Sequence, residues 1–180
     1  MAGNSSIKGF DRLIKDLISL GNDLPEKIRG VALQNAKELA ATAKSNAPVN
    51  DGLLRSSIRV DEESDRNTFY SFVVEANAGH AAYMEFGTGR KVQVPAELQS
   101  LASEIQNAPS GRSFEEGLNA IKDWAKKKGL SEDDAYPIFM SILRNGVTPH
   151  PFLYPALLRQ RNIYYQDLEN LLNNELKKID

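Results

Sequence analysis

Residues 25–60, PEKIRGVALQNAKELAATAKSNAPVNDGLLRSSIRV, decide the fold because the pattern changes within them from helical to extended. Residues 25–46 are rich in Ala, Leu, Lys and Glu, and their apolar and small residues recur at helical spacing. Pro25 suits the first turn of this helix, and Pro48 ends it. Because small side chains allow a second backbone to come close, the helix is expected to lie against a sheet.

The partner of this helix is predicted directly downstream. Residues 56–61 have a β-like pattern, residues 61–67 are polar, and residues 68–76 alternate as a strand does. Two such strands around a polar turn form a hairpin. Upstream, apolar residues between Phe10 and Ile18 predict a short amphipathic helix that stops at Gly21 and Asn22.

The second half of the chain is predicted to be helical. Residues 95–106 are helix-like, and further helices begin after Ser113 and Ser131. The last of these three helices is expected to bury Ile138, Phe139, Ile142 and Leu143. A final helix follows Pro151 and Pro155 and continues to about residue 179.

The sequence therefore predicts an α+β fold. A small antiparallel sheet is packed by a long helix in the N-terminal half and a long C-terminal helix. Residues 1–90 and 149–180 form the core domain, and residues 91–148 form a helical insertion of the size of a small subdomain.

Composition limits the classes of function. The 180 residues carry a net charge of −2, so a global basic field is absent. The chain has no Cys, which excludes disulfides, thiol catalysis and Cys-based zinc sites. The first eight residues lack the apolar core of a signal peptide, and no stretch approaches the roughly 20 apolar residues of a membrane span. We expect a soluble protein that contacts no membrane.

The most reactive-looking peptide is Glu85-Phe86-Gly87-Thr88-Gly89. Glu85 has the chemistry of a general base, as in a phosphohydrolase, and the glycines could cradle a phosphate. A phosphate loop, however, requires a Lys-Ser/Thr pair that is missing here. We favour a turn in which Glu85 accepts hydrogen bonds from backbone N–H groups or pairs with an arginine, with Arg55 as the candidate.

Other candidates for chemistry are weaker. The two histidines, His80 and His150, stand beside turns, and their spacing does not indicate a metal site. The adjacent carboxylate pairs point in different directions and suit helix caps and turns. The sequence thus predicts no catalytic residue, no cofactor and no metal.

Two further features have a functional and a structural interpretation. The basic run at residues 126–128 could bind DNA, as in a nucleic-acid-binding regulatory protein, or could simply neutralise the end of a helix. The acids Glu132, Asp133 and Asp134 that begin the next helix disfavour DNA binding. Tyr164 and Tyr165 could form an interface hot spot, or one ring could lie in the core and the other at its rim.

Three peptides mix apolar anchors with Pro or Gly at turns. They are residues 47–58, residues 83–89 and residues 151–157, and in this order they resemble the phage minor tail-component family of the lambdoid siphovirus type. Members of this family are neck, head–tail joining or tail-completion proteins. The residues expected to hold these turns or to form interfaces are Pro48, Gly52, Leu54, Arg55, Tyr83, Glu85, Phe86, Gly87, Gly89, Pro151, Phe152 and Pro155.

The resemblance implies a structural, non-enzymatic virion protein of a tailed bacteriophage. Such a protein is expected to form a homo-oligomeric ring in the neck or head–tail connector, assembled in the cytoplasm of the bacterial host. Its partners would be copies of itself, portal-side and other connector proteins, and tail proteins. Genomic DNA would be cargo that passes through the lumen, which a mildly acidic subunit suits. The insertion departs from the shorter members of the family.

Overall fold

The computed structural model describes residues 10–63, 70–91, 94–100, 102–103 and 113–178. These residues pack as two compact units. Unit 1 contains the first long helix, the hairpin and the last helix, and unit 2 contains the turn at residues 47–54 together with the described part of residues 77–152. The predicted α+β class, with a small antiparallel sheet and long helices, is confirmed.

Unit 1 is built on α1, which runs without interruption from Phe10 to Asn46. The predicted stop at Gly21 and Asn22 is wrong. Pro25 lies inside the helix, where it removes the hydrogen bond to the carbonyl of residue 21 and its ring crowds that carbonyl. Two residues further on, α1 is tied to α7, because Lys27 Nζ lies 2.8 Å from Glu175 Oε2.

The sheet of unit 1 is a two-stranded antiparallel hairpin, as predicted. Strand β1 (Ile58–Glu62) pairs with β2 (Phe72–Ala76), and Ile58 lies opposite Ala76. Helix α1 contacts both strands, which confirms that the long helix lies against a sheet. Residues 64–67 of the predicted turn at residues 61–67, and residues 68 and 69 of the predicted second strand, lie outside the described residues.

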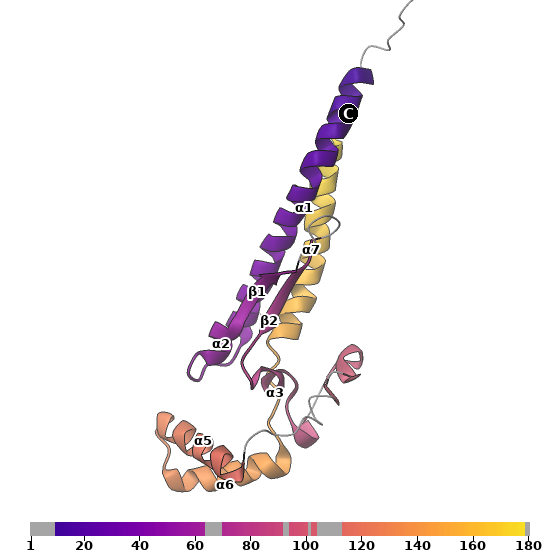
Figure 1. Ribbon diagram of the computed structural model, residues 1–180. Helices are drawn as coiled ribbons and strands as arrows, with labels where there is room; N and C mark the ends of the chain where they lie inside the picture. Colours follow the sequence, from indigo (N-terminus) through magenta and orange to yellow (C-terminus); the bar gives the residue numbers. More distant parts are fainter. Residues whose placement is uncertain (1–9, 64–69, 92–93, 101, 104–112, 179–180) are drawn as a thin grey trace, which may run out of the picture. The chain divides into compact units, whose positions relative to one another are not determined.

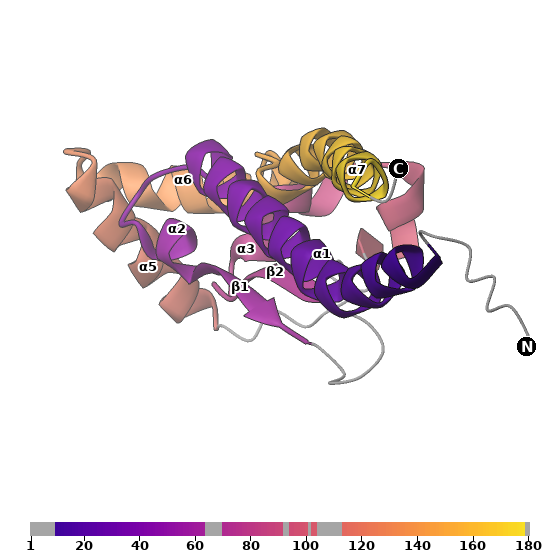
Figure 2. The same ribbon diagram turned by 90° about the horizontal axis from the view of Figure 1, so that it is seen from above.

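Helix α7 (Leu153–Leu176) completes unit 1 and lies beside α1 in both views (Figures 1 and 2). Asn35 on α1 donates to Asp167 Oδ2 at 2.9 Å, and Gln160 Nε2 donates to Asn35 Oδ1 at 2.7 Å. Lys27, which precedes Asn35 on α1, pairs with Glu175, which lies nearer the C-terminus of α7 than the partners of Asn35. The two helices are therefore antiparallel. Small residues carry much of this core: Ala36, Ala40, Ala43 and Ala156.

Unit 2 contains a helical hairpin of α5 (Phe114–Lys127) and α6 (Glu132–Asn145). Both helices begin with a capping box, at Ser113 and at Ser131, as the sequence pattern indicated. The Phe114 and Phe139 rings meet edge to face at 5.0 Å between centroids. Gly117 is needed here because a Cβ atom would lie 2.9 Å from the Phe139 ring.

One burial prediction for α6 is wrong. Phe139 is buried, but the side chain of Leu143 is 55% exposed, and Ile138 and Ile142 are half-buried. The main contact of α6 is with α5, which covers one side of it, so the predicted apolar face is wider than this contact. Part of the helix predicted at residues 95–106 lies outside the described residues. The described part of this range begins with a 3-10 helix, η2 (Ala96–Leu98).

Candidate functional site

The 83–89 turn begins within a short helix, α3 (Ala81–Phe86). The helix ends when the N–H of Gly87 donates to the carbonyl of Tyr83 at 2.9 Å. Gly87 has φ 77° and ψ −176°, a region of backbone space that is essentially restricted to glycine. Gly89 (φ 60°) then opens the 3-10 turn η1 (Gly89–Lys91).

The 83–89 turn is held against the 147–152 segment by hydrogen bonds between residues about sixty positions apart. The N–H of Thr88 donates to the carbonyl of Val147 at 3.1 Å, and the N–H of Val147 donates to Thr88 Oγ1 at 2.8 Å. The N–H of His150 donates to the carbonyl of Met84 at 2.7 Å. Two of the three sequence motifs are therefore neighbours in space, although α5 and α6 lie between them along the chain.

Glu85 makes the fourth link. Its side chain is 6% exposed, and Oε2 accepts a hydrogen bond of 2.8 Å from the N–H of Phe152. Phe152 itself is 1% exposed and is the largest fully buried side chain described. A carboxylate that accepts a backbone N–H in a buried site is a strong, charge-assisted anchor. Glu85 therefore accepts a backbone hydrogen bond, which is one of the two roles expected for it.

Glycines allow the two segments to approach closely. A Cβ atom on Gly87 would lie 2.7 Å from the carbonyl oxygen of Val147, and one on Gly146 (φ 77°) would overlap the carbonyl of Thr88. Gly89 lies close to Gly146, because a Cβ atom added at Gly89 would be 3.3 Å from Cα of Gly146. The sequence singled out Gly87 and Gly89 but missed Gly146, whose signal was its place after the last helical residue of α6.

This geometry does not suit a phosphate cradle. The N–H groups of Gly87 and Thr88, which would have to face an anion, donate instead to the carbonyls of Tyr83 and Val147. Among the described residues no group of three or more His, Asp or Glu side chains could hold a metal ion. The His150 ring is exposed, and its Nδ1 atom lies 3.0 Å from the carbonyl oxygen of Thr148.

The 47–55 motif forms a turn of its own. Ala47 and Leu54 are buried, and Gly52 (φ 81°) lies before α2 (Leu53–Ser57). The N–H of Leu53 donates to Asp51 Oδ1 at 3.1 Å, which fixes the start of α2. Arg55 Nη2 donates to the carbonyl of Ser45 at 3.4 Å.

Two apolar residues beside this turn escaped the sequence analysis. Val49 is 56% exposed and Leu53 is 59% exposed, while their neighbours Ala47 and Leu54 are buried. We call Val49 and Leu53 the turn patch. The sequence does contain a sign of this patch. A large apolar residue stands on each side of the turn at residues 50–52, at positions where exposed polar residues would be expected.

The remaining motif residues have contrasting environments. Phe86 is buried and Tyr83 is half-buried, which suits anchoring of the 83–89 turn. Pro48 is half-buried, whereas Pro151 and Pro155 are exposed. Pro155 lies in the first turn of α7, where its missing N–H costs nothing.

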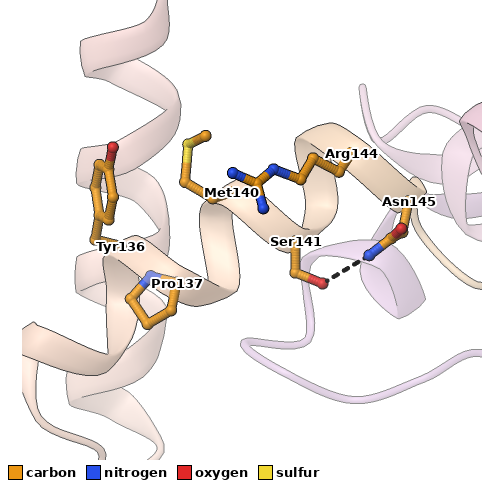
Figure 3. Close-up of a pocket in the computed structure, with 6 residues that line it drawn as sticks. All are labelled: Tyr136, Pro137, Met140, Ser141, Arg144 and Asn145. Carbon is orange, nitrogen blue, oxygen red and sulfur yellow. Dashed lines mark hydrogen bonds between the residues drawn. The ribbon is translucent and has the colours of Figure 1, made fainter.

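A shallow depression lies on α6 (Figure 3). It measures about 370 Å³ and is lined by Tyr136, Pro137, Met140, Ser141, Arg144 and Asn145. Asn145 Nδ2 donates to Ser141 Oγ at 3.2 Å, so two of its polar groups satisfy each other. All the lining residues come from one helix, and none of them is a buried polar group aimed at a ligand. The depression does not resemble an active site.

Comparison with known protein families finds a match in the first part of the chain. Residues 11–87 match the family described as "Bacteriophage HK97-gp10, putative tail-component". The match covers nearly all of α1, the hairpin and the 83–89 turn up to Gly87. No curated protein and no solved structure matches the chain significantly. The predicted resemblance to a phage tail-component family is confirmed over these residues.

Proposed function

We propose that this protein is a structural, non-enzymatic component of a tailed-phage virion, located in the neck or head–tail connector as a homo-oligomeric ring through which DNA passes. The family match over residues 11–87 carries the proposal, because it joins the long helix, the hairpin and the 83–89 turn to phage tail components. The described site supports a scaffold role, since Glu85, its most reactive-looking group, is engaged with the backbone N–H of Phe152.

A ring needs two different complementary faces on each subunit. The turn patch, Val49 and Leu53, is a candidate for part of one face. Large apolar side chains that are more than half exposed beside a rigid turn are typical of protein contacts when they cluster. Leu54 and Ala47 are buried in the same turn, which favours a fixed backbone and lowers the ordering cost of a contact through the patch.

Charge is compatible with a DNA passage. The net charge of −2 gives the subunit no strong attraction for phosphates, so a lumen built from it would let DNA move. None of the helices among the described residues is long and apolar enough to cross a membrane.

The test has two parts. Cryo-electron microscopy of purified particles is expected to show the chain as a closed ring between portal and tail. The Leu53→Asp variant is expected to stay folded by circular dichroism and to lose ring formation and particle assembly. Leu143→Asp, at an equally exposed leucine on α6, is the matched control and should assemble normally. Particles that lack the chain, or equal behaviour of the two variants, would refute the proposal in its first or second part.

A nucleic-acid-binding regulator is the competing function. Lys126, Lys127 and Lys128 are all exposed at the end of α5, which is the observation in its favour. Glu132, Asp133 and Asp134 form the first turn of α6 directly afterwards and would repel phosphates. A salt-sensitive mobility shift with duplex DNA, lost in a Lys126→Glu variant, would support this function over the connector.

A further inference from the structure

Helix α7 has an apolar outer stripe that unit 1 leaves uncovered. Its inner side contacts α1 through buried residues such as Ala156, Gln160 and Glu175. On another side, Leu158 is 39% exposed, Tyr165 62% and Leu172 42%. These three residues are seven positions apart, so they drift by only about 20° around the helix at each step. We call Leu158, Tyr165 and Leu172 the α7 stripe.

The α7 stripe is symmetric about its centre. Tyr165 lies seven residues from each leucine, and the stripe spans about 21 Å at 1.5 Å per residue. Arg161 lies four residues before Tyr165, and Glu169 lies four residues after it. Both charged side chains are exposed, and neither forms an ion pair with another residue in the part of the chain that the structure describes. They are about 12 Å apart along one helix, too far to pair with each other.

We infer that the α7 stripe is the contact surface for a second copy of this chain, with the two α7 helices antiparallel and Tyr165 on the two-fold axis. In this arrangement Leu158 lies opposite Leu172 of the second copy, and Arg161 lies opposite Glu169 of the second copy. The contact buries three apolar layers and forms two ion pairs. A parallel pair in register would instead place Arg161 beside Arg161 and Glu169 beside Glu169, so the charges select the antiparallel arrangement.

This contact differs from the contact between neighbours in the proposed ring. It uses the same surface on both copies and therefore closes after two, whereas a ring needs two different surfaces. The pairing thus does not rest on the proposed function. It predicts that the free protein forms dimers, either before a ring assembles or between two rings.

Cysteine crosslinking tests the axis directly, because the natural chain has no Cys. Tyr165→Cys puts one thiol of each copy on the two-fold axis, where mild oxidation should convert most of the protein to a covalent dimer. Asn170→Cys, also exposed but about 140° away around α7, is the matched control and should crosslink slowly. Equal rates for the two variants would overturn the inference.

A charge exchange tests the direction of pairing. In sedimentation velocity at low salt, Arg161→Glu should raise the dissociation constant of the dimer by about tenfold, because two ion pairs become two repulsions. Glu169→Arg should do the same, and the double variant should restore dimerisation, which a parallel pair cannot explain. Failure of this rescue overturns the antiparallel pairing. A natural chain that stays monomeric at all concentrations overturns the contact itself.

Discussion

Replacing Gly87 by alanine tests whether the 83–89 turn and the 147–152 segment depend on their close approach. Gly87 occupies a backbone region that costs other residues about 1–3 kcal/mol. The new Cβ atom would also lie 2.7 Å from the carbonyl oxygen of Val147, so that segment must move. Movement weakens the two hydrogen bonds between Thr88 and Val147, each worth about 1 kcal/mol. The expected loss in free energy of unfolding is about 3–5 kcal/mol.

Gly52→Ala is the control, because Gly52 has a similar φ of 81° and a Cβ atom there would meet nothing within 4 Å. It should cost only about 1–2 kcal/mol of backbone strain. Urea unfolding followed by the fluorescence of Trp124, the single tryptophan and a member of unit 2, measures both variants. For an m-value of about 2 kcal/mol/M, the midpoint should fall by about 1.5–2.5 M for Gly87→Ala. Equal midpoints for the two variants would refute the reasoning.

Three other substitutions have defined outcomes. Phe152→Ala should lower the free energy of unfolding by about 3–5 kcal/mol because the ring is fully buried, whereas the half-exposed Phe114→Ala should cost much less; equal urea midpoints would contradict the anchoring role of Phe152. Ser131→Ala removes the cap of α6 and should cost about 1 kcal/mol in the same titration. Hydrogen bonds from Lys178 and Lys27 lower the pKa of Glu175, so its stabilising effect is complete above the ordinary carboxyl pKa and is lost as the pH falls through the lower folded value. The melting temperature of Glu175→Gln should therefore lie below that of the natural protein at pH 7, and the gap should close in acid; a gap independent of pH would argue against this.

Local signals predicted the elements well where sequence and packing agree. The alternation at residues 68–76 and the polar residues before it were enough for the hairpin, and Ser113 and Ser131 marked two helix starts that the structure confirms. Helix α1 shows the limit of such reasoning. Gly21 and Pro25 are local helix breakers, but the stabilisation that keeps the helix continuous comes from α7, more than a hundred residues away.

The candidate site shows the same limit. Sequence reasoning identified Glu85 and Phe152 separately, and it listed a backbone N–H as a possible donor to Glu85. It could not identify Phe152 as that donor, because 66 residues separate the two and no periodicity reports on such a distance. The exposure of Leu143 was likewise missed, since helical spacing shows which residues share a face but not how much of that face a neighbour covers.

The hydrogen bonds between Thr88 and Val147 have a consequence for how this chain can change its length. They tie together the two points at which the chain leaves for the helical hairpin and returns from it. We therefore expect that the segment between Gly89 and Gly146 can be exchanged, because the residues at its two ends are held side by side. Shortening it to a tight bridge, or replacing it with a foreign domain whose ends are adjacent, leaves the anchors at Glu85 and Phe152 in register. The length and content of this segment could then vary without any change in the residues that hold its two ends together.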